Sequence, residues 1–167
     1  MSKQAAFDPY ALLQALDRER IGYVVIGAFA RVVHGSAETS DGLDVVPSLR
    51  EENLRRLGHA LEQLRAPVTD LAERVAASEP VTAETSAGEL RIVTHPWGTR
   101  GYDDLRIRAF RENLGRGARP QVASLVDCVR MLEASEREPD AERLLRLRRL
   151  MELERRLVPE RGLSIDF

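Results

Sequence analysis

The segment from Tyr23 to Pro47 constrains the fold more than any other part of the chain. Tyr23-Val24-Val25-Ile26 is a short apolar run rich in β-branched residues, and it ends at Gly27, which is typical of a buried strand that runs into a turn. Residues 28–33 then have the length of a short helix, and Leu43-Asp44-Val45-Val46 is a second strand stopped by Pro47. Two strands joined by a helix predict an α/β unit.

Helices and a hairpin are predicted on both sides of this unit. Asp8-Pro9 begins a helix that runs to about Arg20, and Ser48-Leu49-Arg50-Glu51 has the pattern of a capping box. Val81–Thr85 and Glu89–Thr94 predict a β-hairpin in which Leu90 and Ile92 share one face and Glu89, Arg91 and Val93 the other. Further helices are predicted over residues 69–77, 102–111 and 139–157 and from Ser124 onward. The expected fold class is α/β, a small mixed β-sheet flanked by helices, with helices at its C-terminal end.

The chain is expected to form a single domain over residues 1–167. It has no internal repeat and no Ser/Gly/Pro-rich linker, and 167 residues are enough to bury a core. We expect the core of the domain at about residues 8–111 and a C-terminal helical segment at about 120–158.

Composition excludes several functional classes. The 25 basic and 27 acidic side chains nearly balance, which argues against a protein built to coat nucleic acid. Cys128 is the only cysteine, so an intrachain disulfide and a cysteine-cluster metal site are impossible. No apolar run approaches the roughly 20 residues of a membrane helix, and the start MSKQAAFDPY lacks the apolar core of a secretory signal. A cytoplasmic protein without membrane contact is expected.

Together, these motifs resemble the nucleotidyltransferase superfamily, and in particular its small bacterial branch that includes abortive-infection toxin-like proteins. The family pattern is a glycine turn at a helix start, a strand with two carboxylates two residues apart, and a third carboxylate on a later strand. Residues 89–105 are similar to the third-carboxylate strand and its loop, and residues 123–140 to the C-terminal helical segment. The resemblance implies a nucleotidyltransferase-like fold and a toxin–antitoxin-like context.

The chemistry of such enzymes explains the pattern. Divalent metal ions bridge the triphosphate, and hard ions such as Mg²⁺ prefer carboxylate oxygens. The glycine turn lets phosphate approach backbone N–H groups at a helix N-terminus. The resemblance therefore implies that Gly27, Ala28, Gly35 and Ser36 contact a nucleotide.

This sequence departs from the pattern at the metal ligands. Asp44 matches the second carboxylate, but Gly42 occupies the first position and Arg91 the third. A lone carboxylate cannot hold a two-metal site. We therefore expect a pseudoenzyme that has lost metal-dependent catalysis, needs no cofactor, and binds a nucleotide, a partner protein or an identical subunit through the old cleft. We also expect Arg91 to form a bidentate ion pair with Asp44, the alternative being an Arg91 that points to solvent.

Two other functions remain open. The first is an active Mg²⁺-dependent nucleotidyltransferase that moves a nucleoside monophosphate to a small molecule, protein or RNA, with Asp41, Asp44 and Glu89 as metal ligands. Asp41 would then need a bulge, because a shift of one residue turns a side chain to the opposite face of a strand. The second is an RNA-binding module that uses an arginine-rich middle segment with nearby aromatic rings. This segment comprises Arg100, Arg106, Arg108, Arg111, Arg116 and Arg119, with Trp97 and Tyr102.

Single residues complete the candidates. His34 is interpreted either as a helix-end residue that contacts carbonyl groups or as a phosphate contact, and His95 either as an ordinary loop residue or as a general base. Glu38 stands where many of the similar proteins carry a basic residue, whereas Asp140 matches their C-terminal segment. The leucine stripe of the last helix could dock a second copy.

Overall fold

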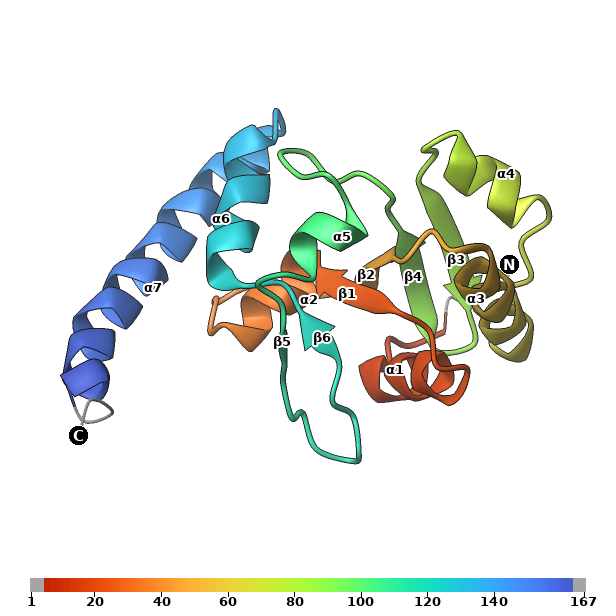
Figure 1. Cartoon of the computed structure of the whole chain (residues 1–167), viewed down its shortest axis with the longest axis horizontal. Coiled ribbons are helices and arrows are strands. Elements are labelled where there is room, and N and C mark those ends of the chain that lie inside the picture. Colours follow the sequence, from red (N-terminus) through yellow and green to blue (C-terminus); the bar gives the residue numbers. More distant parts are fainter. Residues whose placement is uncertain (1–4, 164–167) are drawn as a thin grey trace.

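The computed structural model describes residues 5–163, and its centre is a six-stranded mixed sheet with the strand order β3-β4-β2-β1-β6-β5 (Figure 1). The strands are β1 (Tyr23–Ile26), β2 (Gly42–Pro47), β3 (Val81–Thr85), β4 (Gly88–Ile92), β5 (Phe110–Arg111) and β6 (Gln121–Val122). β1 is antiparallel to β2 and parallel to β6, and β2 is parallel to β4. The predicted fold class is confirmed.

Seven helices surround this sheet in the described part of the chain. They are α1 (Pro9–Arg18), α2 (Gly27–Val33), α3 (Glu51–Gln63), α4 (Leu71–Ala76), α5 (Tyr102–Leu105), α6 (Leu125–Ala134) and α7 (Glu138–Leu163). α1 packs against α3, β2 and β4, while α2 packs against β1, β2 and α6. α6 and α7 lie side by side at one end of the molecule, and α7 extends past the sheet (Figure 1). Of the helices described, none is both long enough and apolar enough to cross a bilayer.

Burial explains why the central strands have their sequences. All four residues of β1 are buried, and α2 and α5 both contact this strand. A continuous apolar run is typical of a buried strand. β4 alternates: Leu90 and Ile92 are fully buried, whereas Glu89 and Arg91 are half-buried. The predicted alternation on this strand is confirmed, and it directs Arg91 away from the apolar core.

The predicted helix starts are confirmed at two places and wrong at one. Asp8 caps α1 by accepting a hydrogen bond from Ala11 N, and Ser124 caps α6 by accepting one from Asp127 N. The capping box at residues 48–51 does not form, because the Ser48 N–H donates to the carbonyl of Gly22 at 2.9 Å and so extends the pairing of β2 with β1. α3 begins only at Glu51, without a side-chain cap.

The helix predicted over residues 102–111 is mostly wrong. α5 ends at Leu105, and Phe110 and Arg111 form β5, which pairs with β6. β6 in turn joins the main sheet beside β1, with Val122 opposite Val25. Strands of two residues have no periodicity that a sequence can display, so their existence depends on the neighbouring strand.

Candidate functional site

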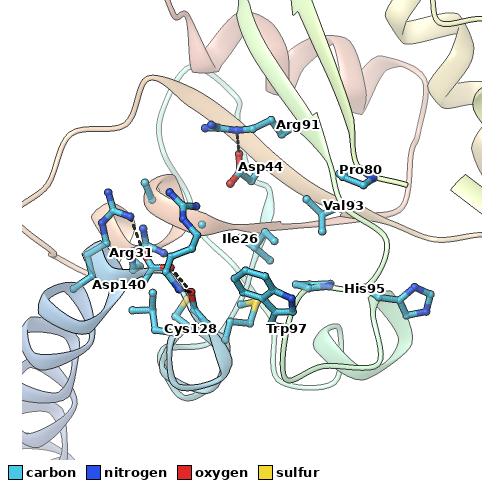
Figure 2. A pocket seen from close by; sticks show the side chains of 18 of the residues that line it. Ile26, Arg31, Asp44, Pro80, Arg91, Val93, His95, Trp97, Cys128 and Asp140 are labelled. Atoms are coloured by element: carbon cyan, nitrogen blue, oxygen red, sulfur yellow. Dashed lines mark hydrogen bonds and ion pairs between the residues drawn. The ribbon is translucent and has the colours of Figure 1, made fainter. Parts of the chain in front are cut away.

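A cavity of about 830 Å³ opens between the sheet and the helical pair α6–α7 (Figure 2). The end of β1, the outer face of β2 and β4, the loop after β4, and the two helices all contribute to its wall. Among the residues lining it are Gly27, Ala28, Arg31, Asp41, Asp44, Arg91, Thr94, His95, Trp97, Cys128, Arg137, Asp140 and Arg143. The cavity brings together residues that are up to about two thirds of the chain apart.

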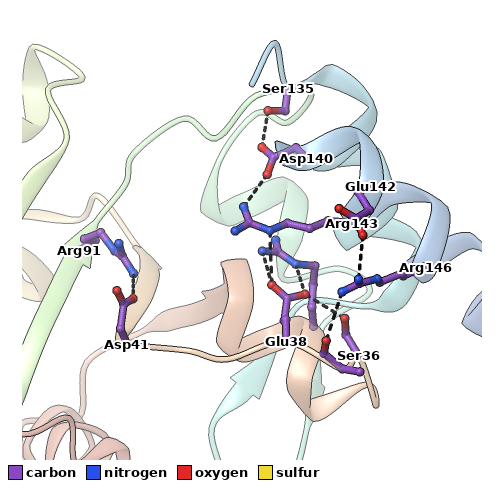
Figure 3. Close-up of polar contacts among 11 residues, drawn as sticks. Ser36, Glu38, Asp41, Arg91, Ser135, Asp140, Glu142, Arg143 and Arg146 are labelled. Atoms are coloured by element: carbon purple, nitrogen blue, oxygen red, sulfur yellow. Dashed lines mark hydrogen bonds and ion pairs between the residues drawn. The ribbon is translucent and has the colours of Figure 1, made fainter. Parts of the chain in front are cut away.

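Arg91 lies at the centre of the polar wall, surrounded by three carboxylates. Its Nε donates to Asp44 Oδ1 (Figure 2), and its Nη2 lies 3.5 Å from Asp41 Oδ1 (Figure 3). Its Nη1 lies 3.3 Å from Glu89 Oε1. The pairing of parallel strands β2 and β4 sets Asp44 directly opposite Arg91. The predicted Asp44–Arg91 ion pair is confirmed, but it is not bidentate, because the guanidinium divides its N–H groups among the three carboxylates.

Asp41 reaches this cluster without a bulge. It precedes β2, which begins at Gly42, so the alternation of side chains along a strand does not apply to it. Its side chain is 96% exposed, whereas that of Asp44 lies deeper in the cleft. The contact of Asp41 with Arg91 is therefore the weakest of the three.

Burial sets the electrostatics of the central pair. Burial raises the pKa of Asp44 above its usual range, and the Arg91 guanidinium offsets only part of that rise. Burial would lower the pKa of Arg91, but the Asp44, Glu89 and Asp41 carboxylates together raise it. The buried Asp44 carboxylate thus depends on the adjacent cation to remain charged.

The position of Gly42 shows how Arg91 fits into the site. A Cβ atom on residue 42 would lie 3.1 Å from Arg91 Nη2 and 3.0 Å from the Glu89 carbonyl oxygen. The guanidinium therefore occupies the space beside residue 42 into which a side chain would extend. The absence of a side chain at Gly42 and the position of the Arg91 guanidinium are therefore sterically linked.

The residues present do not fit a divalent cation. Asp41, Asp44 and Glu89 converge on one positive charge, and that charge is the guanidinium of Arg91. A metal ion at the same place would be repelled by it. Within residues 5–163, no group of three or more His, Cys, Asp and Glu side chains has an arrangement that could hold a metal ion.

A second ion pair, between Arg31 and Glu38, lies at the other side of the cavity (Figure 3). It is bidentate: Arg31 Nε donates to Glu38 Oε2 at 2.9 Å and Nη2 donates to Oε1 at 3.0 Å. The two side chains are only 10% and 11% exposed. The sequence analysis did not predict this pair. The available signal was Glu38, because an acidic residue at a position that the resemblance makes basic indicates that a basic partner lies nearby.

Helix α7 is attached to the core through the same ion pair. Arg143 Nε lies 3.7 Å from Glu38 Oε1, and Arg146 Nη1 donates to the Ala37 carbonyl at 3.3 Å. Asp140 accepts hydrogen bonds from Ser135 Oγ at 2.5 Å and from Arg143 Nη1 at 2.8 Å (Figure 3). These contacts hold the helical arm over the cavity.

Two of the four predicted nucleotide contacts lie at the cavity. Gly27 and Ala28 line it, whereas Gly35 and Ser36 are not among the described lining residues. The Ser36 hydroxyl donates to Glu38 Oε2 at 2.9 Å instead. Ser36 thus contacts the Glu38 side of the Arg31–Glu38 ion pair, and the nucleotide contacts at all four residues stay a prediction.

The loop after β4 forms a further wall of the cavity, which is aromatic and apolar. Trp97 lines it and is 52% exposed, an unusual exposure for the largest apolar side chain. Thr94, also in the wall, is 3% exposed, and its Oγ1 has no hydrogen-bond partner among the residues that the structure describes. His95 contacts the Ser78 hydroxyl through Nδ1 at 3.2 Å. This wall presents the ring surface of Trp97 to the cavity, whereas the Thr94 hydroxyl is buried behind it.

The remaining candidate residues are His34 and Cys128. His34 Nε2 lies 2.8 Å from the Ala123 carbonyl oxygen, so its partner is a backbone group near α6 and not a carbonyl of its own helix. Burial raises the pKa of the Cys128 thiol to about 12, which agrees with an inert core cysteine.

The arginines of the middle segment have different surroundings. Arg108 pairs with the buried Asp127 at 3.0 Å, and Arg106 with Asp103 at 3.5 Å. Arg111 and Arg119 line a different cavity from Trp97. An RNA-binding surface on this segment stays a prediction.

Comparisons with known proteins agree with this architecture. No protein-family model matches the chain, and no curated protein matches it in sequence. The solution structure of the antibiotic-resistance factor ANT(2'')-Ia is similar, with a TM-score of 0.56 and 14% identity over 95% of this chain and 92% of that one. The crystal structure of ANT(2'')-Ia with adenylyl-2''-tobramycin gives a TM-score of 0.54 and 15% identity over 83% and 84% of the two chains.

A third similar structure comes from Thermotoga maritima. That protein, assigned as a nucleotidyltransferase, has a TM-score of 0.50 and 15% identity, over 93% of this chain and 97% of its own. These similarities extend over nearly the whole of each chain. Taken with the sheet order and the helices around it, they show that this chain has the fold of the nucleotidyltransferases.

Proposed function

We propose that this protein is a nucleotidyltransferase-fold binding protein that has lost metal-dependent transfer and holds a nucleoside or nucleoside monophosphate in its cleft without a divalent ion. The observation that carries the proposal is the Arg91 guanidinium among the carboxylates of Asp41, Asp44 and Glu89. A built-in cation supplies the positive charge that these carboxylates would otherwise take from a metal.

Charge pairing in the cleft favours a ligand of low negative charge. Arg31, Arg91 and Arg143 each already contact a carboxylate. Among the four arginines that line the cavity, Arg137 alone has a guanidinium without an ion pair or hydrogen bond to another described residue, although its charge helps to lower the pKa of Asp140. One free guanidinium suits a single phosphate group, whereas a triphosphate without metal would lack compensating charge.

The aromatic wall supports a planar base as the other half of the ligand. A base stacked on Trp97 would cover its exposed ring. ANT(2'')-Ia was solved with adenylyl-2''-tobramycin. We extend only the nucleotide half of that ligand to this chain.

Intrinsic fluorescence tests the proposal, because Trp97 is the only tryptophan of the chain. We expect adenosine and adenosine monophosphate to change its emission saturably in the presence of EDTA, with no gain on addition of Mg²⁺. The Arg137→Ala variant should weaken the monophosphate but not the nucleoside. Arg106→Ala, which alters an exposed pair outside the cleft, is the matched control. Binding of nucleotides only with Mg²⁺ would contradict the proposal.

An active transferase is the second candidate, and the convergence of three carboxylates favours it. If Arg91 moved aside, Asp41, Asp44 and Glu89 would remain as oxygen ligands. The test is Mg²⁺-dependent release of pyrophosphate from nucleoside triphosphates, compared with Asp44→Ala. We expect none from either protein, and release that Asp44→Ala abolishes would establish the transferase. With the binding role, and not with the transferase, we also propose membership of the bacterial abortive-infection toxin-like branch. In that role a partner protein or a second copy of the chain is the alternative to a nucleotide at the cleft.

A further inference from the structure

A second cavity, of about 550 Å³, lies at the opposite end of β1 from Gly27 and Asp44. It is formed where the turn after α1 meets the start of β1, the first turn of α5, and the β5–β6 hairpin. Its size is within the range of small-ligand pockets. Its lining includes Asp17, Arg20, Tyr23, Tyr102, Arg111 and Arg119.

Positive charge is in excess in this second cavity, unlike in the cleft. Arg20, Arg111 and Arg119 line it, and Asp17 is the only carboxylate among the described lining residues. The guanidinium groups of Arg20 and Arg119 form no ion pair or hydrogen bond with another described residue. Arg111 uses one N–H group, from Nη1, on the Arg119 carbonyl at 3.1 Å, and its other donors remain available.

The single carboxylate is already engaged. Asp17 Oδ1 accepts a hydrogen bond from the Tyr23 hydroxyl at 2.9 Å. Burial, together with the adjacent Asp17, raises the pKa of Tyr23 above its ordinary range, so this phenol stays a neutral donor. Within the described chain, no salt bridge joins Asp17 to any of the three arginines.

Backbone geometry holds these groups around the cavity. Arg20 has a left-handed conformation with φ of +54°, and its carbonyl accepts from Arg56 Nη1 at 3.4 Å. The Tyr102 hydroxyl lies against Gly22, where a Cβ atom would come within 3.1 Å of it. That hydroxyl has no hydrogen-bond partner within the described chain and adds a neutral donor to the wall.

We propose that this second cavity, lined by Arg20, Tyr102, Arg111 and Arg119, binds a small phosphate-bearing anion at a site separate from the cleft. Guanidinium groups bind phosphate oxygens through paired N–H donors, and three of them around one cavity can satisfy the three oxygens of a phosphate monoester. Inorganic phosphate and the phosphate of a small sugar phosphate share this chemistry. The proposal does not depend on what the cleft binds.

Calorimetric titration of the full chain with inorganic phosphate and with ribose 5-phosphate, both in EDTA, tests the proposal. Neither probe carries a base, so Trp97 emission should stay constant while heat is released. Arg20→Gln and Arg119→Gln should each weaken binding about tenfold or more, because each removes a charged hydrogen-bond donor. Tyr102→Phe should weaken it by a smaller factor. Stronger binding of ribose 5-phosphate than of phosphate identifies a sugar phosphate as the ligand class.

A matched control separates this site from general charge effects. Arg106→Gln removes another exposed arginine of the same segment, one that pairs with Asp103 outside the cavity. It should bind the two probes as the wild type does. The proposal is overturned if neither probe binds at millimolar concentration, if Arg106→Gln weakens binding as much as Arg119→Gln, or if only an oligoribonucleotide binds. The last result would indicate a nucleic-acid surface instead.

Discussion

The Asp44 carboxylate lies directly against the backbone of Gly27: a Cβ atom on residue 27 would come within 2.5 Å of Asp44 Oδ2. Asp44 is opposite Ile26 in the pairing of β1 and β2, which places its carboxylate over the turn that follows β1. Gly27 also has a φ of +72°, a conformation that favours glycine. The turn and the carboxylate therefore form one unit, and neither residue can change independently of the other.

Replacing Gly27 by alanine should destabilise the protein through both effects. We expect Gly27→Ala to lower the free energy of unfolding by about 2–4 kcal/mol, because a strained φ and a steric contact are combined. Gly35→Ala is the matched control, since Gly35 has a φ of +101° but no atom within 4 Å of an added Cβ. Denaturant unfolding should show a clearly smaller loss for Gly35→Ala. Equal losses would mean that Asp44 does not constrain residue 27.

Removing the built-in cation and restoring a carboxylate should create metal binding. In the Gly42→Asp/Arg91→Ser double variant, Asp41, Asp44, Glu89 and the new residue would surround a space without opposing positive charge, which suits a hard dication. We expect Mn²⁺ to bind this variant, as measured by electron paramagnetic resonance. Gly42→Asp alone should not bind it, because the new side chain would start 3.1 Å from Arg91 Nη2 and pair with it. Comparable Mn²⁺ binding by the wild type would contradict this account.

The buried Arg31–Glu38 ion pair should matter more for stability than exposed pairs do. Glu38→Gln leaves the Arg31 charge buried without a compensating carboxylate, and we expect a loss of about 2–4 kcal/mol in unfolding free energy. Glu52→Gln breaks an exposed pair with Arg55 and should leave stability nearly unchanged. Chemical denaturation of the two variants at neutral pH makes the comparison. A loss for Glu38→Gln no larger than that for Glu52→Gln would argue against a buried pair.

The free energy of unfolding should also decrease in acid, and the protonation of Glu38 and Asp140 sets the direction of this change. Burial would raise the pKa of Glu38, but hydrogen bonds from Arg31 and Ser36 outweigh burial and hold the pKa below its ordinary value. Asp140 behaves in the same way through Ser135 and Arg143. The contribution of these two carboxylates to the free energy of unfolding is therefore present above their ordinary pKa values. It is lost as the pH falls below about 4.5. Unfolding measured between mildly acidic and strongly acidic pH should show this decline, and the decline should be shallower in Glu38→Gln.

Asn53 should contribute more to the stability of the protein than the exposed polar residues of α3 do. Its Oδ1 accepts from Gly22 N at 2.7 Å, and its Nδ2 donates to the carbonyls of Gly22 at 3.0 Å and Ser48 at 2.8 Å. Asn53→Ala leaves three backbone groups without this partner, so we expect a loss of about 2–4 kcal/mol. Gln63 lies on the same helix as Asn53 and makes one exposed hydrogen bond to Glu19. Gln63→Ala, which removes that bond, is the control. Similar thermal unfolding of the two variants would contradict the bridging role.

The parts of the fold that depend on local sequence were predictable. The strand and turn at residues 23–27, the alternation along β4, and the caps at Asp8 and Ser124 follow from side-chain periodicity and from hydrogen bonds between near neighbours. The Asp44–Arg91 pair could be anticipated only because a family resemblance supplied the strand pairing. β5 and β6 could not be anticipated, since strands of two residues carry no pattern of their own.

By itself, the sequence determined where most of the strands and helices lie and which face of β4 carries Glu89 and Arg91, because these properties belong to single residues and short segments. Only the tertiary structure decided that Arg91 meets three carboxylates, that Glu38 joins Arg31 to α7, and that Arg20, Arg111 and Arg119 surround one cavity. Each of these arrangements depends on strand order and helix packing between distant segments. The energy of a charge is set by which neighbours those segments bring to it.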